Sequence, residues 1–259
     1  MSTLRFLGLL LHTNLRASLA LRGAFMLQAG LMALNNLVYF SVWLIFFDRF
    51  HDLAGFGLKD MELTYGVVAC GFGLAVACAG GLRELSRMVV EGALDSYLAQ
   101  PKPVLLQVLC SRTLASGWGD LATGLVMVGV SRQVSLGHVP YLLLAIALST
   151  TVFVAAGVIF HSTAFWLGPM DSLPRMLWDF LLTFSIYPEP IFGGRVRVLL
   201  YTLMPAAFTG FLPARLVRRP SLPNLGLAVG GATAVVCFAW FMFERGLRRY
   251  ESGNQIGAR

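Results

Sequence analysis

Long apolar runs, each close to the length that crosses a lipid bilayer, recur along this chain and restrict its fold more than any other feature. A transmembrane helix needs about 20 predominantly apolar residues, because the hydrocarbon core of a bilayer is about 30 Å thick. The runs that reach or approach this length cover residues 24–47, 63–82, 113–130, 141–167 and 225–243. Because backbone polar groups in lipid must be satisfied inside the protein, these runs predict an all-α integral membrane protein.

The charged residues agree with this class. They make up 13% of the chain, against about 25% in an average soluble domain, and the mean hydropathy is +0.71. The net charge of +7 would suit a nucleic-acid partner, but the basic residues lie at the ends of the apolar runs and form no continuous patch. We therefore interpret them as determinants of membrane topology and expect no nucleic-acid partner.

The segments between the runs predict the orientation. Residues 1–22 set leucines against Arg5 and Arg16, a pattern typical of an interfacial helix on the cytoplasmic face. The loop 48–62 has four acidic residues and two basic ones, which favours the outside. Both ends inside require an even number of crossings, so we predict six in the cell (inner) membrane, with both termini cytoplasmic. The basic residues that place the C-terminal tail inside are Arg245, Arg248 and Arg249.

The region before the last run is broken. The run 176–187 is too short to span comfortably, and the run 198–217 contains Pro205 and Pro213. Irregular backbone at membrane depth is tolerated only where protein or a water-filled cavity covers it. We therefore expect one crossing plus a re-entrant outer segment within residues 188–222, and the sequence leaves open which run crosses. One feature opposes this topology, because three arginines would lie outside: Arg215, Arg218 and Arg219.

The longest polar interruption, residues 83–103, has internal order. On a helix its charged residues share one face, namely Glu84, Arg87, Glu91 and Asp95. The opposite side gathers Leu85, Met88, Val89, Leu94 and Leu98. Opposite charges three or four residues apart stabilise a helix by roughly 0.2–0.5 kcal/mol per pair. We interpret the segment as an amphipathic helix on the membrane surface that ends before Pro101 and Pro103; a solvated connector is the alternative.

Small residues recur every four positions in the run 63–82. They are Ala69, Gly73, Ala77 and Gly81. A stripe of this kind lets another helix backbone approach closely, so we expect it to pack against a neighbouring helix.

Several polar residues lie within the apolar runs. Asn35 and Asn36 need a partner, for which bonding between helices and ligand contact are the alternatives. A carboxylate inside the membrane, here Asp120, costs about 2.5–3.5 kcal/mol on insertion scales. It has three readings: an ion pair with Arg112, a place on a transport path, or a proton relay. A lone His161 is expected to be a hydrogen-bonded packing residue.

Common catalytic and nucleotide-binding motifs are absent. The chain has no GxxxxGK[ST] loop, and its only lysines are Lys59 and Lys102, so we expect it to bind no ATP itself. It has no HExxH, GxSxG or CxxC motif, and neither a catalytic nor a metal site is expected. The cysteines lie in or beside apolar runs and predict buried free thiols: Cys70, Cys78, Cys110 and Cys237.

Several short motifs occur in order along the chain. They are Gly92-Ala93-Leu94-Asp95 followed by Leu98 and Pro101, then Tyr187-Pro188 with Phe192, Pro205-Ala206-Ala207-Phe208, Pro213, and the closing run from Gly246 to Ser252. Together they resemble the motifs of ABC-2-type transporter permeases, in particular the branch of small six-span subunits. In that family the pattern G-x-L-D-x-x-L-x-x-P lies between the second and third spans.

The resemblance implies a single transmembrane permease domain over residues 1–259, driven by an ATPase on a separate polypeptide that binds ATP and Mg. The loop 83–103 would carry a cytoplasmic coupling helix that docks on this ATPase. A second permease subunit, identical or homologous, would pair with the first. The expected coupling residues are Glu84, Arg87, Glu91, Gly92, Leu94, Asp95, Leu98 and Pro101.

Export of an apolar or amphipathic compound, a lipid or a peptide is the expected activity. An intramembrane lipid-modifying enzyme and a non-transporting scaffold or channel are the alternatives. The candidate substrate path consists of Asn35, Asn36, Asp120, Tyr187 and Glu189.

Overall fold

The predicted apolar runs are helical in the computed structural model, which describes residues 3–169 and 172–250. Each long helix begins and ends within a few residues of its run. By length and composition, four helical segments can cross a membrane: 22–50, 58–78, 136–167 and 222–247. The chain is therefore a multi-pass membrane protein. Its long helices are α2 (Arg22–Phe50), α3 (Leu58–Cys78), α7 (Ser116–Ser131), α8 (Val139–Ser162) and α13 (Leu222–Leu247).

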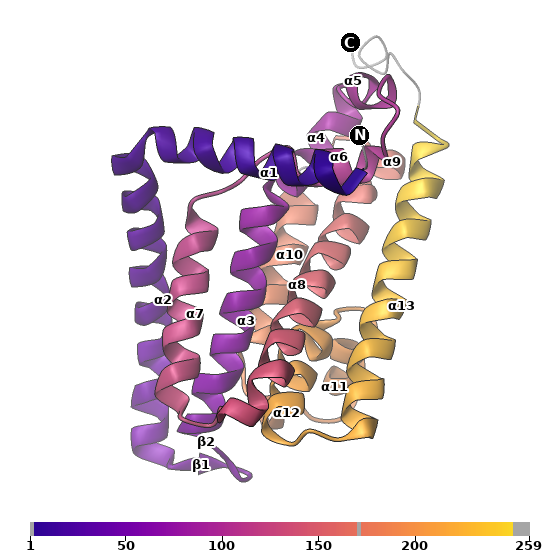
Figure 1. Cartoon of the computed structure of the whole chain (residues 1–259). Coiled ribbons are helices and arrows are strands. Elements are labelled where there is room, and N and C mark those ends of the chain that lie inside the picture. Colours follow the sequence, from indigo (N-terminus) through magenta and orange to yellow (C-terminus); the bar gives the residue numbers. More distant parts are fainter. Residues whose placement is uncertain (1–2, 170–171, 251–259) are drawn as a thin grey trace.

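Figure 1 shows these helices running side by side, with short elements gathered at the two ends of the bundle. One end carries α1 (Thr3–Ala20), α4 (Leu85–Val90), α5 (Asp95–Leu98), α6 (Val104–Leu109) and α9 (Ala164–Leu167). We call it the α1 end. The opposite end carries a two-stranded hairpin and α12 (Leu212–Arg218), and we call it the hairpin end.

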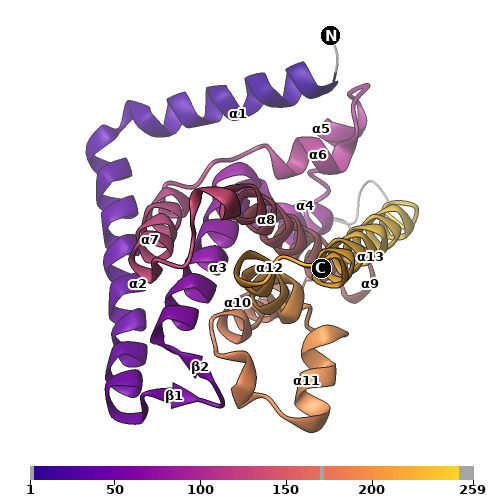
Figure 2. The same cartoon turned by 60° about the horizontal axis from the view of Figure 1, so that its bottom comes forward.

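Helix α1 lies across the bundle and meets α2 at a sharp corner (Figures 1 and 2). Two side chains join it to the segment before α7. The Asn14 amide donates to the Cys110 carbonyl at 2.8 Å, and the Ser18 hydroxyl donates to the Thr113 carbonyl at 3.4 Å. The expected surface helix is thus present over residues 3–20; the first two residues and the tail from 251 onward lie outside the described residues.

Helix α3 occupies the centre of the bundle, and 89% of its most apolar 18-residue stretch is buried. It approaches α7 through glycines. A Cβ at Gly73 would lie 2.6 Å from the Gly117 carbonyl oxygen, and a Cβ at Gly117 would lie 2.8 Å from the Ala77 nitrogen. The other end of the stripe contacts a different element, because a Cβ at Gly81 would meet the Val108 carbonyl of α6. The four small residues therefore serve more than one neighbour.

The main core joins the α1 end to the middle of the bundle. It contains buried residues of α3, α4, α6, α8, α13 and α10 (Ser172–Ser185). At its centre the Phe72 ring lies 5.3 Å from Phe153 and 5.2 Å from Trp178, centroid to centroid. The Trp178 indole also donates to the Phe153 carbonyl at 3.0 Å. Helices α3, α8 and α10 are thereby fixed to one another.

The broken region before α13 consists of short pieces. After α10 come η3 (Glu189–Ile191), α11 (Gly194–Tyr201), the π-helical η4 (Ala207–Phe211) and α12. The run 198–217 is therefore not one helix, whereas 176–185 belongs to the 14-residue α10. Buried side chains satisfy part of the irregular backbone: the Ser149 hydroxyl donates to the Thr209 carbonyl at 2.7 Å, and the Thr209 hydroxyl donates to the Ala206 carbonyl at 2.9 Å. The Thr209 hydroxyl also shares a 2.5 Å hydrogen bond with the Ser185 hydroxyl.

The arginines that oppose the predicted topology are mostly neutralised locally. The Arg215 guanidinium pairs with Glu189 at 2.5 Å, and Arg218 pairs with Asp60 at 2.8 Å. Arg197 also reaches Glu189, at 3.2 Å. The positive-inside tendency counts Lys and Arg and gives little weight to carboxylates, so these pairs stabilise the arginines where they lie but leave the conflict with the predicted topology in place.

The predicted all-α class is confirmed, with one small addition, and the expectation for the cysteines is wrong in part. The addition is a short antiparallel hairpin of β1 (Asp52–Leu53) and β2 (Phe56–Gly57) in the loop 48–62. Gly55 has a φ of +80°, which glycine adopts at no steric cost, and it permits the tight turn. All four cysteines are free, but Cys78 and Cys237 are exposed. Cys78 is the last residue of α3, and Cys237 lies on α13, whose apolar surface is mostly unburied.

The close approach of α3 and α7 predicts an asymmetry between two glycines of α7. Gly117→Ala would place a methyl group 2.5 Å from the Gly73 carbonyl oxygen and should destabilise the fold by about 1–3 kcal/mol. Gly129→Ala, which meets nothing within 4 Å, should be neutral or slightly stabilising. Thermal unfolding in detergent measures both, and equal midpoints for the two variants would contradict this packing.

Candidate functional site

Two neighbouring cavities of the bundle are lined by several charged and polar side chains. The central cavity, of about 310 Å³, is bounded by α2, α3, α7 and α10. The arginine cavity, of about 290 Å³, lies where η1 (Gly80–Glu84) and the segment before α7 meet α10. Asp179 lines both cavities. Together they form a polar region that runs from the α1 end into the bundle.

The central cavity is built around Asp120, whose side chain is 3% exposed. The Asn36 amide donates to one Asp120 carboxylate oxygen at 2.7 Å, and the Tyr65 hydroxyl donates to the Asn36 carbonyl at 3.1 Å. The second Asp120 oxygen has no hydrogen-bond partner among the described residues. The remaining lining is mixed, with Met32, Asn35, Tyr39, Ala69, Phe72, Asp179, Leu182, Thr183 and Ile186.

The ion pair expected between Asp120 and Arg112 does not form. Arg112 pairs instead with Glu84, at 3.0 Å. The expectation assumed one continuous helix from residue 112, but α7 begins only at Ser116. The partner of Asp120 is Asn36, which the sequence analysis did not identify. The two could have been paired from the sequence because both are polar residues in the middle of apolar runs.

The candidate substrate-path residues do not all meet. Asn35, Asn36 and Asp120 line the central cavity. The Tyr187 ring packs edge-on against Trp43 at 5.2 Å between centroids. Glu189 is held by Arg197, Arg215 and the Tyr201 hydroxyl, the last at 3.2 Å. Glu189 therefore serves as an anchor for the broken region and is not among the residues that line the central cavity.

The amphipathic segment is a sequence of short helices. Elements η1 and α4 lead to a turn over residues 91–94, followed by α5 and then α6. Gly92 has a φ of +75°, a conformation that side chains disfavour, and this breaks the single helix predicted from the charge spacing. The two predicted ion pairs of Arg87 form, with Glu84 at 2.5 Å and with Glu91 at 3.8 Å.

The segment has the two faces that its sequence predicts. Leu85 and Leu94 are fully buried and belong to the main core. The Arg87 and Glu91 side chains are 49% and 55% exposed, and Asp95 and Pro101 are also exposed. The apolar face does not lie on a surface, because it is inserted among α8, α9 and α10 at the α1 end of the bundle. Leu98 differs from the other apolar residues, since it is 44% exposed.

A buried hydrogen bond connects this segment to α8. The Ser86 hydroxyl lies 2.9 Å from Nδ1 of His161, and the exposed fractions of these residues are 1% and 0%. His161 is therefore a hydrogen-bonded packing residue on the last turn of α8. The sequence does not single out Ser86, because a serine in an amphipathic segment is ordinarily assigned to the polar face.

The end of α13 also contacts the segment. The Tyr250 hydroxyl would lie 3.8 Å from a Cβ at Gly92, and the Tyr250 ring packs edge-on against Phe165 at 6.4 Å. Burial, together with the neighbouring Asp95 carboxylate, raises the pKa of Tyr250 to about 12. The turn at residues 91–94 is thus held between α13, α9 and the main core.

The comparisons with known proteins give one match. The model of the family described as ABC-2 family transporter protein matches residues 33–254. No curated protein and no solved structure matches the chain. The matched range includes the whole segment 80–109 and every residue that lines the two cavities except Met32.

The contacts of Asp120 predict which double mutant is non-additive. Asn36→Ala and Asp120→Ala should show a coupling energy of about 0.5–3 kcal/mol, because they remove two partners of one buried bond. Arg112→Gln and Asp120→Ala should add to within about 0.5 kcal/mol. Unfolding free energies in detergent complete both cycles, and coupling between 112 and 120 with none between 36 and 120 would contradict the structure.

Proposed function

The chain belongs to the ABC-2 family of transporter proteins, and from this membership we propose that it is the membrane-spanning permease subunit of an exporter driven by a separate ATPase. ATP and Mg would be bound by that partner. The observation that carries the proposal is the construction of residues 80–98. On their charged face Arg87, Glu91 and Asp95 are exposed, whereas Glu84 is mostly buried; their apolar face belongs to the same core as α8, α10 and α13.

This construction suits a coupling element. An ATPase can shift a permease only through its different affinity for the permease conformations. A docking surface that is part of the main core transmits such a shift to α8 through Ser86 and His161, and to α13 through Tyr250. The docking residues are proposed to be Glu84, Arg87, Glu91, Gly92, Leu94, Asp95, Leu98 and Pro101. Of these, Leu94 would act from inside the core, because it is fully buried.

We propose six crossings, made by α2, α3, α7, α8, α10 and α13, with both termini in the cytoplasm. Helices α7 and α10 have 16 and 14 residues and are about 24 and 21 Å long, so they would cross with help from their flanking segments. Residues 188–222 would form the re-entrant outer segment. The basic residues at the α1 end favour the cytoplasmic side for that end, by the positive-inside tendency: Arg5, Arg16, Arg22, Arg245, Arg248 and Arg249.

The substrate path is proposed to run through the central cavity. Asn35, Asn36 and Asp120 supply polar contacts there, and Phe72, Leu182 and Ile186 supply apolar ones. Such a lining suits an amphipathic substrate. Helix α2 borders this cavity, yet only 22% of its most apolar 18-residue stretch is buried. We therefore propose that a second permease subunit, identical or homologous, packs on α2 and completes the path.

The alternative of an intramembrane enzyme has less support. The Ser86–His161 pair has the residue types of a nucleophile and base, but both side chains are fully enclosed and reach neither cavity. The pair therefore suits a structural connection better than a catalytic one.

Thiol labelling tests the proposed topology. Single cysteines at Gly137 and Ser96, in a background without the four native cysteines, lie at the hairpin end and on the α4–α5 segment, respectively. Both positions are exposed, and a Cβ at Gly137 meets nothing within 4 Å. A membrane-impermeant reagent should label position 137 in intact cells and position 96 only after permeabilisation. The reverse pattern would contradict the orientation.

Charge reversal tests the docking surface. Glu91→Arg with Asp95→Arg should leave membrane insertion intact, because neither residue lies in a proposed crossing. It should weaken ATPase binding by several kcal/mol if the charges face a complementary surface. Co-purification of the ATPase with the tagged permease measures the effect.

The matched control is the double reversal Asp48→Arg with Asp52→Arg at the hairpin end, which should leave ATPase binding unchanged. Glu91→Arg alone separates docking from any change in the loop, because Tyr250 neighbours Asp95 and not Glu91. Wild-type co-purification of both the double and the single variant would contradict the docking role of this face.

A further inference from the structure

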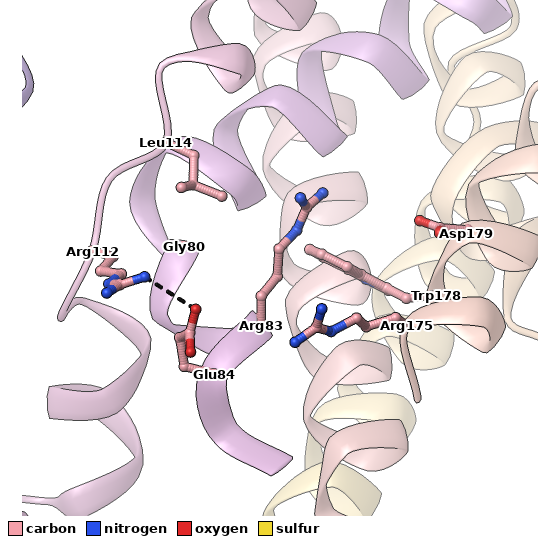
Figure 3. Close-up of a pocket in the computed structure, with 8 residues that line it drawn as sticks. All are labelled: Gly80, Arg83, Glu84, Arg112, Leu114, Arg175, Trp178 and Asp179. Atoms are coloured by element: carbon pink, nitrogen blue, oxygen red, sulfur yellow. Dashed lines mark hydrogen bonds and ion pairs between the residues drawn. The ribbon is translucent and has the colours of Figure 1, made fainter. Parts of the chain in front are cut away.

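The arginine cavity contains two cations that have no hydrogen-bond or ion-pair partner among the described residues. Arg83 extends from η1 and Arg175 from α10, and Figure 3 shows both guanidinium groups beside the Trp178 ring. The Arg83 guanidinium lies over that ring, 5.5 Å from its centroid. Among residues 3–169 and 172–250, neither arginine has a hydrogen bond or an ion pair within 4.0 Å.

The other charged groups of the cavity leave this excess in place. Glu84 is already bound by Arg87 at 2.5 Å and by Arg112 at 3.0 Å. Asp179 lines the cavity without forming an ion pair among the described residues, so it offsets the two free guanidiniums only in part. Arg83 is half-buried and Arg175 is exposed, so the two like charges repel one another in a partly enclosed site, and a bound anion would relieve this repulsion.

The geometry suits an anion with several oxygens. Guanidinium groups bind phosphate and carboxylate through paired N–H donors, and Arg is preferred over Lys where such planar contacts matter. The Trp178 ring, itself 2% exposed, holds Arg83 in place and limits its rotamers. Gly80, which also lines the cavity, has no side chain to fill it.

We propose that the arginine cavity is a binding site for a phosphate-type oxyanion, held between Arg83 and Arg175. The volume of about 290 Å³ is at the lower limit for small-molecule sites and suits a single headgroup or a free phosphate, not a whole lipid. The cavity lies at the α1 end, where headgroups of one leaflet would be found if that end faces the cytoplasm (Figures 1 and 3).

Its position gives the site a role in transport, an extension that depends on the proposed function. Gly80, Arg83 and Glu84 belong to the start of the coupling segment, and Asp179 also lines the central cavity. An anion bound here would touch both the element that meets the ATPase and the proposed substrate path. An amphipathic substrate with a phosphate headgroup would then be recognised at the entrance to that path.

Binding to the purified full-length chain in detergent tests the site without any ATPase. The probes are inorganic phosphate and a fluorescent short-chain phosphatidylglycerol, with the matching phosphatidylcholine as a zwitterionic reference. Arg83→Gln and Arg175→Gln should each weaken binding of phosphatidylglycerol, of inorganic phosphate or of both by about tenfold or more, because each removes a charged hydrogen-bond donor pair. Arg83→Lys should lose less, since it keeps the charge.

Arg195→Gln is the matched control, because Arg195 is an exposed arginine on α11, outside the cavity. It should bind both probes as the wild type does. Loss of phosphatidylglycerol binding alone identifies a lipid headgroup, and loss of binding of both probes identifies a general phosphate site. Arg175 is exposed and its substitution should not affect folding, so unchanged binding of both probes by Arg175→Gln overturns the proposal. Failure of ATPase co-purification would leave this binding result unaffected.

Discussion

The burial of the apolar face of residues 85–94 in the main core is the constraint on which the rest of the structure depends. Leu85 and Leu94 are fully buried there, together with Phe153 of α8 and Trp178 of α10. A loop packed in this way cannot move without its neighbours, because protein interiors are close-packed and respond to shifts as units. The same burial leaves the charged face of the segment exposed at the α1 end, where a partner can reach it.

Most carboxylates of the bundle have a local partner. Asp120 is bound by Asn36, Asp60 by Arg218, and Glu189 by Arg215. The buried Glu62 differs, since it has no hydrogen bond or ion pair among the described residues. Such partners matter because an unpaired buried charge is costly. The half-buried Arg83 and the exposed Arg175 of the arginine cavity also have no such partner among residues 3–169 and 172–250, which supports the ligand site proposed there.

The sequence predicts the long helices and the two faces of the segment 83–103, because both depend on local hydrophobic periodicity. It does not predict contacts that depend on where helices begin. The pair Arg112–Asp120 failed because α7 begins at Ser116, and the single amphipathic helix failed because Gly92 adopts a positive φ. The arginine cavity was missed for the same reason: Arg83 and Arg175 are 92 positions apart, and only the packing of α10 brings them together.

We propose that the ATPase meets the permease at the exposed face of this segment. A photo-crosslinking amino acid placed at Arg87, whose side chain is 49% exposed, tests this contact in the assembled complex. We expect a crosslink from position 87 to the ATPase and none from the exposed position 48 at the opposite end of the bundle. A co-purifying ATPase that crosslinks to position 48 and not to position 87 would contradict it.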